Sequence, residues 1–455
     1  MGPSPTRPSP PAGLSRGARR ARRLSALALA LSLAAGCNKA SSDNIQLWKT
    51  TEKGPEKLNE TLADHGTPPQ LRAEAAVALV DIGRAEQVDT TFQSLPPDDR
   101  AEVFKKLEPI YEVGMKDPSP DKALQARDGL YSLRQFVTPD DQKRIDAALL
   151  PALEADLKAG KLKQGRHSID KMLTAIGSDA GAMLARVLAE PDAKFEQAAE
   201  LLGKIGDAEA REKGGAALVA RAKAEKPGKS ASGGKAGKSE EEAILKALGT
   251  VGGPSAVKYL EEKVSSPNKD EAALAVRALQ ERRDPAVLPF AIKVASDPRG
   301  DKIVRDEMFG VIESIGGLEA QRGLLGIISS DKEEIVRYRA FESALTAGKS
   351  EAIQPALEAF PAAAAYKKVD VDDLLVKLIE KLGPPARPAL VKTLGSSAPL
   401  ARMTALMSLE QVGRAADAPA VEKLSDDSTS IKGFPAGETI GKEAVRVAEA
   451  LKKKP

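Results

Sequence analysis

Apolar residues recur at helical spacing in short blocks along most of the chain, and each block ends in a turn signal. In the block from Phe195 to Ala210, five apolar residues fall on one helical face: Phe195, Ala198, Ala199, Leu202 and Ile205. Gly206 can adopt the left-handed conformation that ends a helix, and Asp207 can cap the next one. The pattern predicts one helix over residues 195–205 and a second amphipathic helix through Leu218.

The same block recurs with a glycine at its end. Apolar-periodic stretches precede Gly83, Gly177, Gly249, Gly316, Gly383 and Gly413, while Arg283 and Gly348 mark two variant turns. From Gly249 onward, successive markers are 30 to 35 residues apart. A repeat of this length predicts an array of helix pairs, because one pair cannot bury its apolar face until neighbours stack on it.

The block from Ala198 to Ala210 resembles the HEAT repeat, particularly the short variety of phycobilisome lyases. The runs Asp284-Pro285-Ala286-Val287-Leu288 and Ala386-Arg387-Pro388-Ala389-Leu390 share the resemblance. It implies an all-α fold, namely a right-handed α-α superhelix of the HEAT/armadillo kind with roughly 10–12 helix pairs. It also implies that the second helix of each pair lines the concave, partner-binding surface.

The first 37 residues have the order of a secretion signal. Arg19-Arg20-Ala21-Arg22-Arg23 precedes an apolar run from Leu24 to Ala35, which at 12 residues is shorter than the ~20 that a membrane-spanning helix needs. Leu33-Ala34-Ala35-Gly36-Cys37 resembles a bacterial lipobox. The resemblance implies cleavage between Gly36 and Cys37 and a lipid on the Cys37 thiol. By the same resemblance, Asn38 favours the outer membrane, facing the periplasm, over the inner membrane. An uncleaved anchor with an incidental cysteine is the alternative.

Composition shifts divide the chain further. We expect the following segments: a signal peptide (1–36), a polar tether (37–44), divergent helical repeats (45–160), HEAT-like repeats (161–222), a flexible Lys/Gly/Ser-rich loop (223–240), more HEAT-like repeats (241–426), a second loop (427–441) and a C-terminal capping helix (442–455). Asp43 or Asn44 can cap a first helix from Ile45, with Trp48 packed beneath it.

Net charge and aromatic content narrow the function classes. Residues 1–36 contain six arginines and no acid, so removing them changes the net charge from +3 to −3. A chain near neutrality lacks the basic footprint of a nucleic-acid binder. Aromatic residues make up only 3% of the chain, which suits closely packed helices better than sheets.

The residues that usually carry chemistry are sparse. The two histidines, His65 and His167, are far apart and have no neighbour at metal-ligand spacing. Gly237-Lys238-Ser239 matches the end of a phosphate loop, but no strand precedes it, so a basic linker explains it better. The sequence predicts no metal, no cofactor and no enzymatic activity.

The function expected is a non-enzymatic scaffold that binds a protein partner while its lipid holds it at the membrane of the bacterial envelope. Alignment on the turns places Lys293, Lys392 and Lys423 at equivalent positions of second helices, where a lysine ladder would meet an acidic partner. A solvated helix face is the simpler explanation of these lysines. A lyase-like or enzyme-accessory role and a purely structural envelope spacer remain alternatives.

Overall fold

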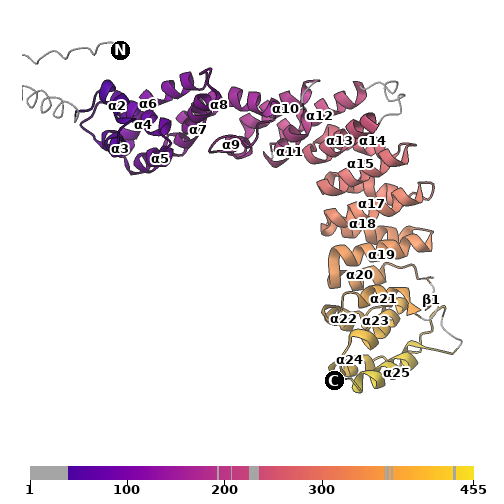
Figure 1. Cartoon of the computed structure of the whole chain (residues 1–455). Helices are drawn as coiled ribbons and strands as arrows, with labels where there is room; N and C mark the ends of the chain where they lie inside the picture. The colour runs from indigo at the N-terminus through magenta and orange to yellow at the C-terminus, as the bar shows by residue number, and fades with distance from the viewer. Residues whose placement is uncertain are drawn as a thin grey trace, which may run out of the picture. The chain divides into compact units, whose positions relative to one another are not determined.

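The computed structural model describes residues 39–191, 194–205, 207–224, 235–362, 364, 368–369, 372–433 and 437–454. Helices account for nearly all regular structure in these residues (Figure 1). The exception is an antiparallel pair of two-residue strands, β1 (Lys368–Val369) and β2 (Asp372–Asp373). The predicted fold class is confirmed: the chain is an all-α solenoid of the HEAT-like kind, built from stacked helix pairs.

The chain divides into two compact units, Met1–Ala180 and Gly181–Pro455, hereafter unit 1 and unit 2. The helices of unit 1 are α2 (Ser42–Trp48), α3 (Gly54–Ala63), α4 (Pro69–Asp81), α5 (Ala85–Ser94), α6 (Pro97–Gly114), α7 (Pro120–Leu133), the 3₁₀ turn η1 (Arg134–Phe136), α8 (Pro139–Lys158) and α9 (Ile169–Ile176). Helix α10 (Ser178–Ala189) contains the division between the two units.

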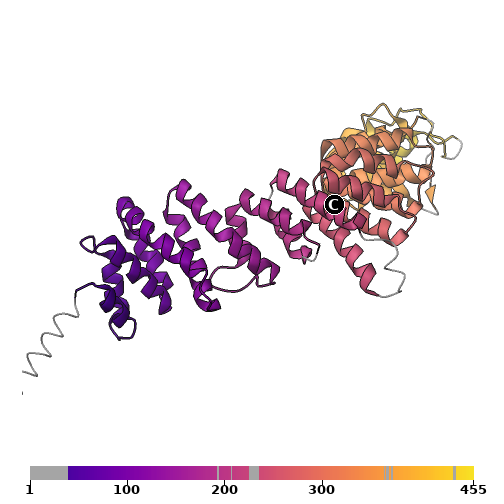
Figure 2. The same ribbon diagram turned by 90° about the horizontal axis from the view of Figure 1, so that it is seen from above.

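Unit 2 is itself an array of stacked helices, and Figure 2 looks along its stack. Its helices are α11 (Phe195–Ile205), α12 (Ala208–Ala224), α13 (Lys235–Val251), α14 (Pro254–Val264), α15 (Lys269–Arg282), α16 (Leu288–Ala295), α17 (Lys302–Ile315), α18 (Gly317–Ser330), α19 (Glu334–Gly348), α20 (Ile353–Glu358), α21 (Leu374–Glu380), α22 (Arg387–Thr393), α23 (Pro399–Val412), α24 (Ala418–Glu422) and α25 (Ile440–Lys452). Four 3₁₀ turns precede second helices: η2 (Pro285–Val287), η3 (Lys349–Ala352), η4 (Pro384–Ala386) and η5 (Ala415–Asp417).

Unit 2 has two layers of helices. The first helices of successive pairs pack on one another from α11 through the odd-numbered helices to α25, and second helices such as α16, α18, α20 and α22 form the other layer. In α11 the predicted apolar face is buried at Phe195, Ala198, Ala199 and Leu202. Asp207 caps α12 as predicted, because its Oδ1 accepts the backbone N–H of Ala210 at 2.8 Å.

Glycines end several helices where the repeat predicted turns. Gly83, Gly177, Gly316 and Gly383 have φ between 64° and 78°, a left-handed conformation that a side chain would strain. The prediction for Gly249 is wrong, because Gly249 lies inside α13 and the turn falls at Gly252-Gly253. Gly413 follows the last residue of α23 as predicted, but its φ of −77° is not left-handed.

The fourth residue of several first helices is an arginine that ties neighbouring repeats together. Arg72 of α4 donates from Nε to the carbonyl of Leu62 at 2.9 Å and pairs with Asp99 of α6 at 3.1 Å. Arg402 of α23 likewise bonds the carbonyl of Ser396 at 2.8 Å and the carboxylate of Asp427 at 2.9 Å. Arg72 therefore links the end of α3 to the first turn of α6, and Arg402 links the turn before α23 to the connection that precedes α25.

Helix ends differ in detail from the sequence expectations. Ser41, rather than Asp43 or Asn44, caps the first described helix by accepting the N–H of Asn44 at 3.2 Å; Trp48 is buried there as expected. At the other end, the Thr439 hydroxyl accepts the N–H of Lys442 at 3.3 Å. Helix α25 consequently begins at Ile440, inside the range predicted as loop.

The segment predicted as a loop at 223–240 is shorter than expected at both edges. Helix α12 continues to Ala224 and helix α13 already begins at Lys235; residues 225–234 lie outside the described residues. Among the helices that are described, none is by itself long and apolar enough to cross a membrane, although α9 and α10 taken as one bent pair reach the required length and composition.

Candidate functional site

A groove of about 1020 Å³ runs across the first helices α17, α19 and α21 of unit 2. These three helices pack side by side in one layer. Their facing positions supply an apolar wall that includes Phe309, Val336, Leu374 and Leu378. This groove follows first helices, whereas the HEAT-repeat resemblance implies that second helices carry the binding surface; that expectation stays a prediction.

Two isoleucines in this groove occupy equivalent places in neighbouring repeats. Ile303 is the second residue of α17, and Ile335 is the second residue of α19. Their side chains are 59% and 63% exposed, which is unusual for large aliphatic residues. Both line the groove, so two strongly exposed aliphatic side chains share one surface, while others, such as Leu318 of α18, lie outside it.

A second cavity, of about 520 Å³, adjoins the groove on the far side of Ile303. It lies between α15, α16 and α17, with Phe290, Val294 and Val304 in its apolar wall. Gly300, Ile303 and Glu307 line both cavities. At the rim, Lys269 and Asp301 form an ion pair of 3.3 Å between the starts of α15 and α17.

The charged side chains of the groove are largely paired with one another. Arg339 of α19 bonds Glu342 at 3.0 Å and lies over the ring of Phe309, 5.6 Å from its centroid. Lys381 pairs with Glu342 at 3.4 Å. These exposed pairs contribute little to stability individually, but they leave the groove without a strong field of either sign.

Arg305 and Glu307 of α17 differ from these exposed pairs. Arg305 is only 7% exposed; its Nε donates to the carbonyl of Ala295 and its Nη1 bonds Glu333, both at 3.3 Å. Its Nη2 donor and the Glu307 Oε2 acceptor are buried without a hydrogen-bond partner. Buried polar atoms of this kind cost free energy until a partner satisfies them.

The lysines singled out in the sequence are exposed, but they are not brought together. Lys293 lies on α16, Lys392 on α22 and Lys423 just after α24. The intervening second helices α18 and α20 carry Gly326 and Glu358 at the corresponding places. Lys293 lines the smaller cavity together with Asp297, Asp301 and Glu307, whereas Lys392 and Lys423 line neither cavity. The predicted ladder is thus interrupted over two repeats.

The lipidation and cleavage residues, Cys37 and Gly36, lie outside the described residues. The lipobox prediction therefore rests on the sequence.

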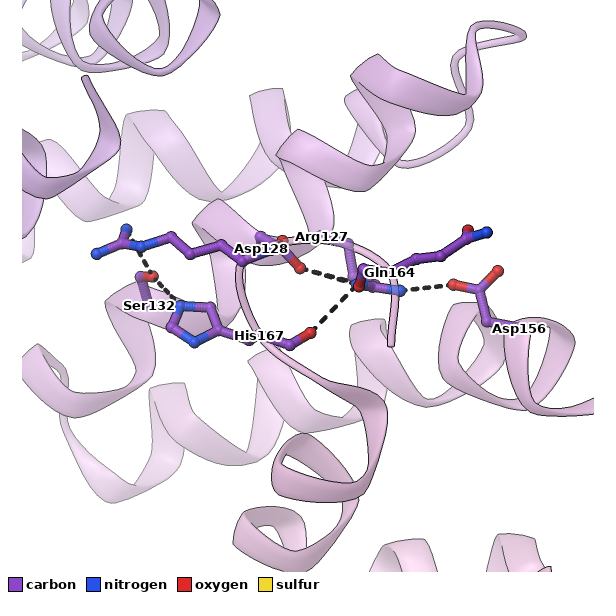
Figure 3. A network of polar contacts seen from close by, with 7 residues as sticks. Arg127, Asp128, Ser132, Asp156, Gln164 and His167 are labelled. Atoms are coloured by element: carbon purple, nitrogen blue, oxygen red, sulfur yellow. Dashed lines mark hydrogen bonds and ion pairs between the residues drawn. The ribbon is translucent and has the colours of Figure 1, made fainter. Parts of the chain in front are cut away.

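A polar network in unit 1 was not foreseen from the sequence (Figure 3). Arg127 of α7, 2% exposed, bonds Asp156 of α8 at 2.6 Å, Asp128 at 2.9 Å and the carbonyl of Gln164 at 2.9 Å. Asp128 also accepts the backbone N–H of Arg166. Together these bonds hold residues 159–168, the connection between α8 and α9, against α7.

His167 lies in this connection and does not open a helix, because α9 begins at Ile169 after the N-cap Ser168. Its Nε2 is 2.9 Å from the hydroxyl of Ser132 on α7, and its ring meets that of Tyr131 edge-on at 4.9 Å. Burial lowers the pKa of His167, because the charged imidazolium loses solvation. Ser132 is only 5% exposed, so this pair ties the connection to α7 and does not present a nucleophile to solvent.

His65 follows the C-cap residue Asp64 of α3 and contacts Asp99. It lies far from His167 in the sequence, and across the residues that the structure describes no group of three or more His, Cys, Asp and Glu side chains is arranged to hold a metal ion.

No protein-family model matches the chain, and no curated protein matches it. Among solved structures, an engineered protein is 17% identical over 88% of this chain and 99% of its own, with a TM-score of 0.26. A Kap121p mutant is 12% identical over 92% of this chain and 50% of its own (TM-score 0.40), and importin beta is 13% identical over 86% and 62% (TM-score 0.29). The chain spans about half the length of the Kap121p structures it matches. All three TM-scores are below 0.5, so these likenesses indicate nothing about what the chain binds.

Proposed function

We propose that this protein is a membrane-tethered lipoprotein that acts as a non-enzymatic scaffold and binds a protein partner through unit 2. The tether is the lipid on Cys37, whose two acyl chains would suffice for stable anchoring where the polar residues after it would not. The proposed location is the bacterial cell envelope, on the outer membrane facing the periplasm. This location rests on the lipobox resemblance and on Asn38.

The observation that carries the binding role is the pair of exposed isoleucines, Ile303 and Ile335, in one groove. A soluble surface that gathers large aliphatic side chains at repeated positions loses free energy to water unless a partner covers them. The same groove holds its charges in internal pairs, such as Arg339 with Glu342, which suits recognition better than chemistry. The Ser132–His167 pair, on the other unit, is buried and serves the fold.

Position-specific crosslinking in intact cells tests the binding role. A photo-reactive amino acid at position 303 should give a discrete adduct with a partner protein. The same amino acid at Leu318, which is 72% exposed on α18 outside the groove, should not. Adducts at neither position would leave a structural spacer as the better explanation. Turnover of a small substrate by the purified protein would overturn the non-enzymatic role.

Cys37→Ser tests the tether separately. The variant should accumulate as unprocessed precursor or as soluble protein, because it lacks the thiol that carries the lipid. A variant that is still cleaved before position 37 and still carries lipid in the membrane fraction would contradict the lipoprotein assignment, while leaving the groove unaffected.

A further inference from the structure

We infer that the partner enters the groove as an extended segment in the polyproline II conformation, with aliphatic side chains three residues apart. This inference rests on the proposed function and names the kind of ligand. It commits to a peptide segment of a partner protein rather than to a folded domain, a membrane or a second copy of this chain.

The two cavities give the first observation. They lie on either side of Ile303, one between α15 and α17 and the other across α17, α19 and α21, and they share Ile303 and Glu307 as lining. A segment that crosses the helices would place one side chain against Phe290 and Val294 and the next against Ile335 and Val336. The smaller cavity, at about 520 Å³, has room for an aliphatic side chain with part of its backbone.

The spacing of stacked helices gives the second observation. Packed helices lie about 8–10 Å apart, so anchor sites that repeat with the helices have the same spacing. A polyproline II segment rises ~3.1 Å per residue with three residues per turn, which puts residues i and i+3 on one side about 9 Å apart. Same-face residues of a β-strand are only ~6.6 Å apart, which is too short.

The unpartnered polar atoms decide between an extended segment and a helix. A helical ligand could also match the spacing with residues seven apart, but its backbone N–H and C=O groups are already bonded to one another. A polyproline II segment has no internal hydrogen bonds, so its carbonyls and N–H groups are free. The groove wall contains an unpartnered donor, Arg305 Nη2, and an unpartnered acceptor, Glu307 Oε2, on the helix that separates the two cavities. Both atoms are buried, and a segment with free backbone groups could satisfy them where a helix could not.

The charge of the groove specifies a neutral segment. The two cavities together are lined by six cationic and six anionic side chains. Several of these are paired, including Lys269 with Asp301 and Arg305 with Glu333. A strongly acidic or basic segment would therefore be repelled by some of these side chains and attracted by others. An uncharged segment would meet no such electrostatic repulsion.

The experiment uses the full mature chain and short fluorescent peptides of alanine and proline that contain two leucines. We expect the peptide with leucines at i and i+3 to bind at least about tenfold more tightly than those with leucines at i and i+2 or i and i+4. An alanine-based helical peptide with leucines at i and i+7 serves as the alternative ligand. Fluorescence anisotropy gives the affinities.

Three variants locate the binding. Ile303→Asp and Ile335→Asp should each weaken binding of the i, i+3 peptide by about tenfold or more, because each places a charge where an aliphatic side chain would pack. Leu318→Asp, at a more exposed apolar residue outside the groove, should leave binding unchanged. Circular dichroism verifies that all three variants fold.

Each contrary result is informative. Equal affinity for all spacings, preference for the helical peptide, absence of peptide binding, or equal loss in Leu318→Asp would each overturn the inference. Self-association of the chain that Ile303→Asp abolishes would identify a second copy as the occupant and would overturn it too. In all these cases a crosslinked adduct at position 303 would still support the scaffold role, so the two proposals can fail separately.

Discussion

Gly249 of α13 lies directly against Ala278 of α15. A methyl group added at Gly249 would be 2.8 Å from both the Cβ and the carbonyl oxygen of Ala278, closer than side-chain carbons approach such atoms. The absence of a side chain at this position lets two first helices of neighbouring repeats pack closely in the middle of their lengths. Gly249 is therefore a packing residue within a helix.

Gly249→Ala should lower the free energy of unfolding of unit 2 by about 1–3 kcal/mol, the usual cost of overpacking a closely packed contact. Gly326→Ala is the matched control, since an added methyl group at this exposed position of α18 meets nothing within 4 Å. That control should stabilise the unit by up to about 1 kcal/mol, because alanine favours a helix over glycine. Calorimetry measures both, and equal effects of the two substitutions would contradict the packing role.

The polar network of unit 1 predicts a large effect at Arg127. Arg127→Ala leaves the carboxylates of Asp128 and Asp156 without their buried cation and frees the carbonyl of Gln164. We expect a loss of about 3–5 kcal/mol in the free energy of unfolding of unit 1. The chain has a single tryptophan, Trp48, which lies in unit 1, so its fluorescence reports unfolding of that unit.

Arg144→Ala provides the comparison for Arg127. Arg144 is about half exposed and pairs with Glu108 at 3.0 Å. An exposed pair contributes at most about 1 kcal/mol, so this variant should unfold nearly as the parent does. A loss as large as that in Arg127→Ala would mean that burial of the guanidinium group is not what matters.

His167 predicts a pH dependence in unit 1. Its pKa in the folded protein is lowered from the ordinary value of 6.5, chiefly because burial penalises the charged ring. The unfolded chain takes up a proton near pH 6.5 that the folded unit accepts only at lower pH. The free energy of unfolding therefore falls as the pH drops below 6.5 and recovers above it.

His167→Gln should flatten this part of the pH profile, because glutamine can still bond Ser132 but does not titrate. His65→Gln, at the only other histidine of the chain, changes an exposed side chain and should keep the slope. The measurement is denaturant unfolding followed by Trp48 fluorescence at several pH values. An unchanged profile in His167→Gln would remove His167 from the explanation.

The sequence was sufficient for features that depend on neighbours along the chain. The apolar face of residues 195–205, the cap at Asp207 and the turns at Gly83 and Gly316 follow from local spacing and backbone preference. Gly249 shows the limit of that approach. In the sequence, a glycine that ends a helix and a glycine that lets a neighbouring helix pack closely can both follow an apolar run. Only the packing of α15 against α13 shows which role Gly249 has.

The groove and the polar network depend on residues distant in sequence. Ile303 and Ile335 look like ordinary core residues in the pattern, yet both side chains are exposed at the starts of α17 and α19. His167 and Ser132 are 35 residues apart, and the connection after α8 brings them together. Alignment on the turns selected three lysines at equivalent positions of second helices. The helices between them, α18 and α20, carry Gly326 and Glu358 at those positions, so the lysines do not form a continuous row.

Charge reversal of the two lysines that lie outside both cavities separates an acidic partner from a neutral one. Lys392→Glu and Lys423→Glu should each change the affinity for the i, i+3 peptide by less than about twofold, since neither lysine lines a cavity and a neutral segment has no net Coulomb interaction with them. Lys293 is left unchanged in this test, because it lines the smaller cavity together with Asp297 and Asp301. Affinity should also vary little with salt, whereas exposed charges that bound an acidic segment would be screened over a Debye length of about 10 Å at 0.1 M salt. If the double variant Lys392→Glu/Lys423→Glu bound more weakly than the parent, and mainly at low salt, these lysines would form an acidic-partner surface and the neutral-segment inference would be wrong.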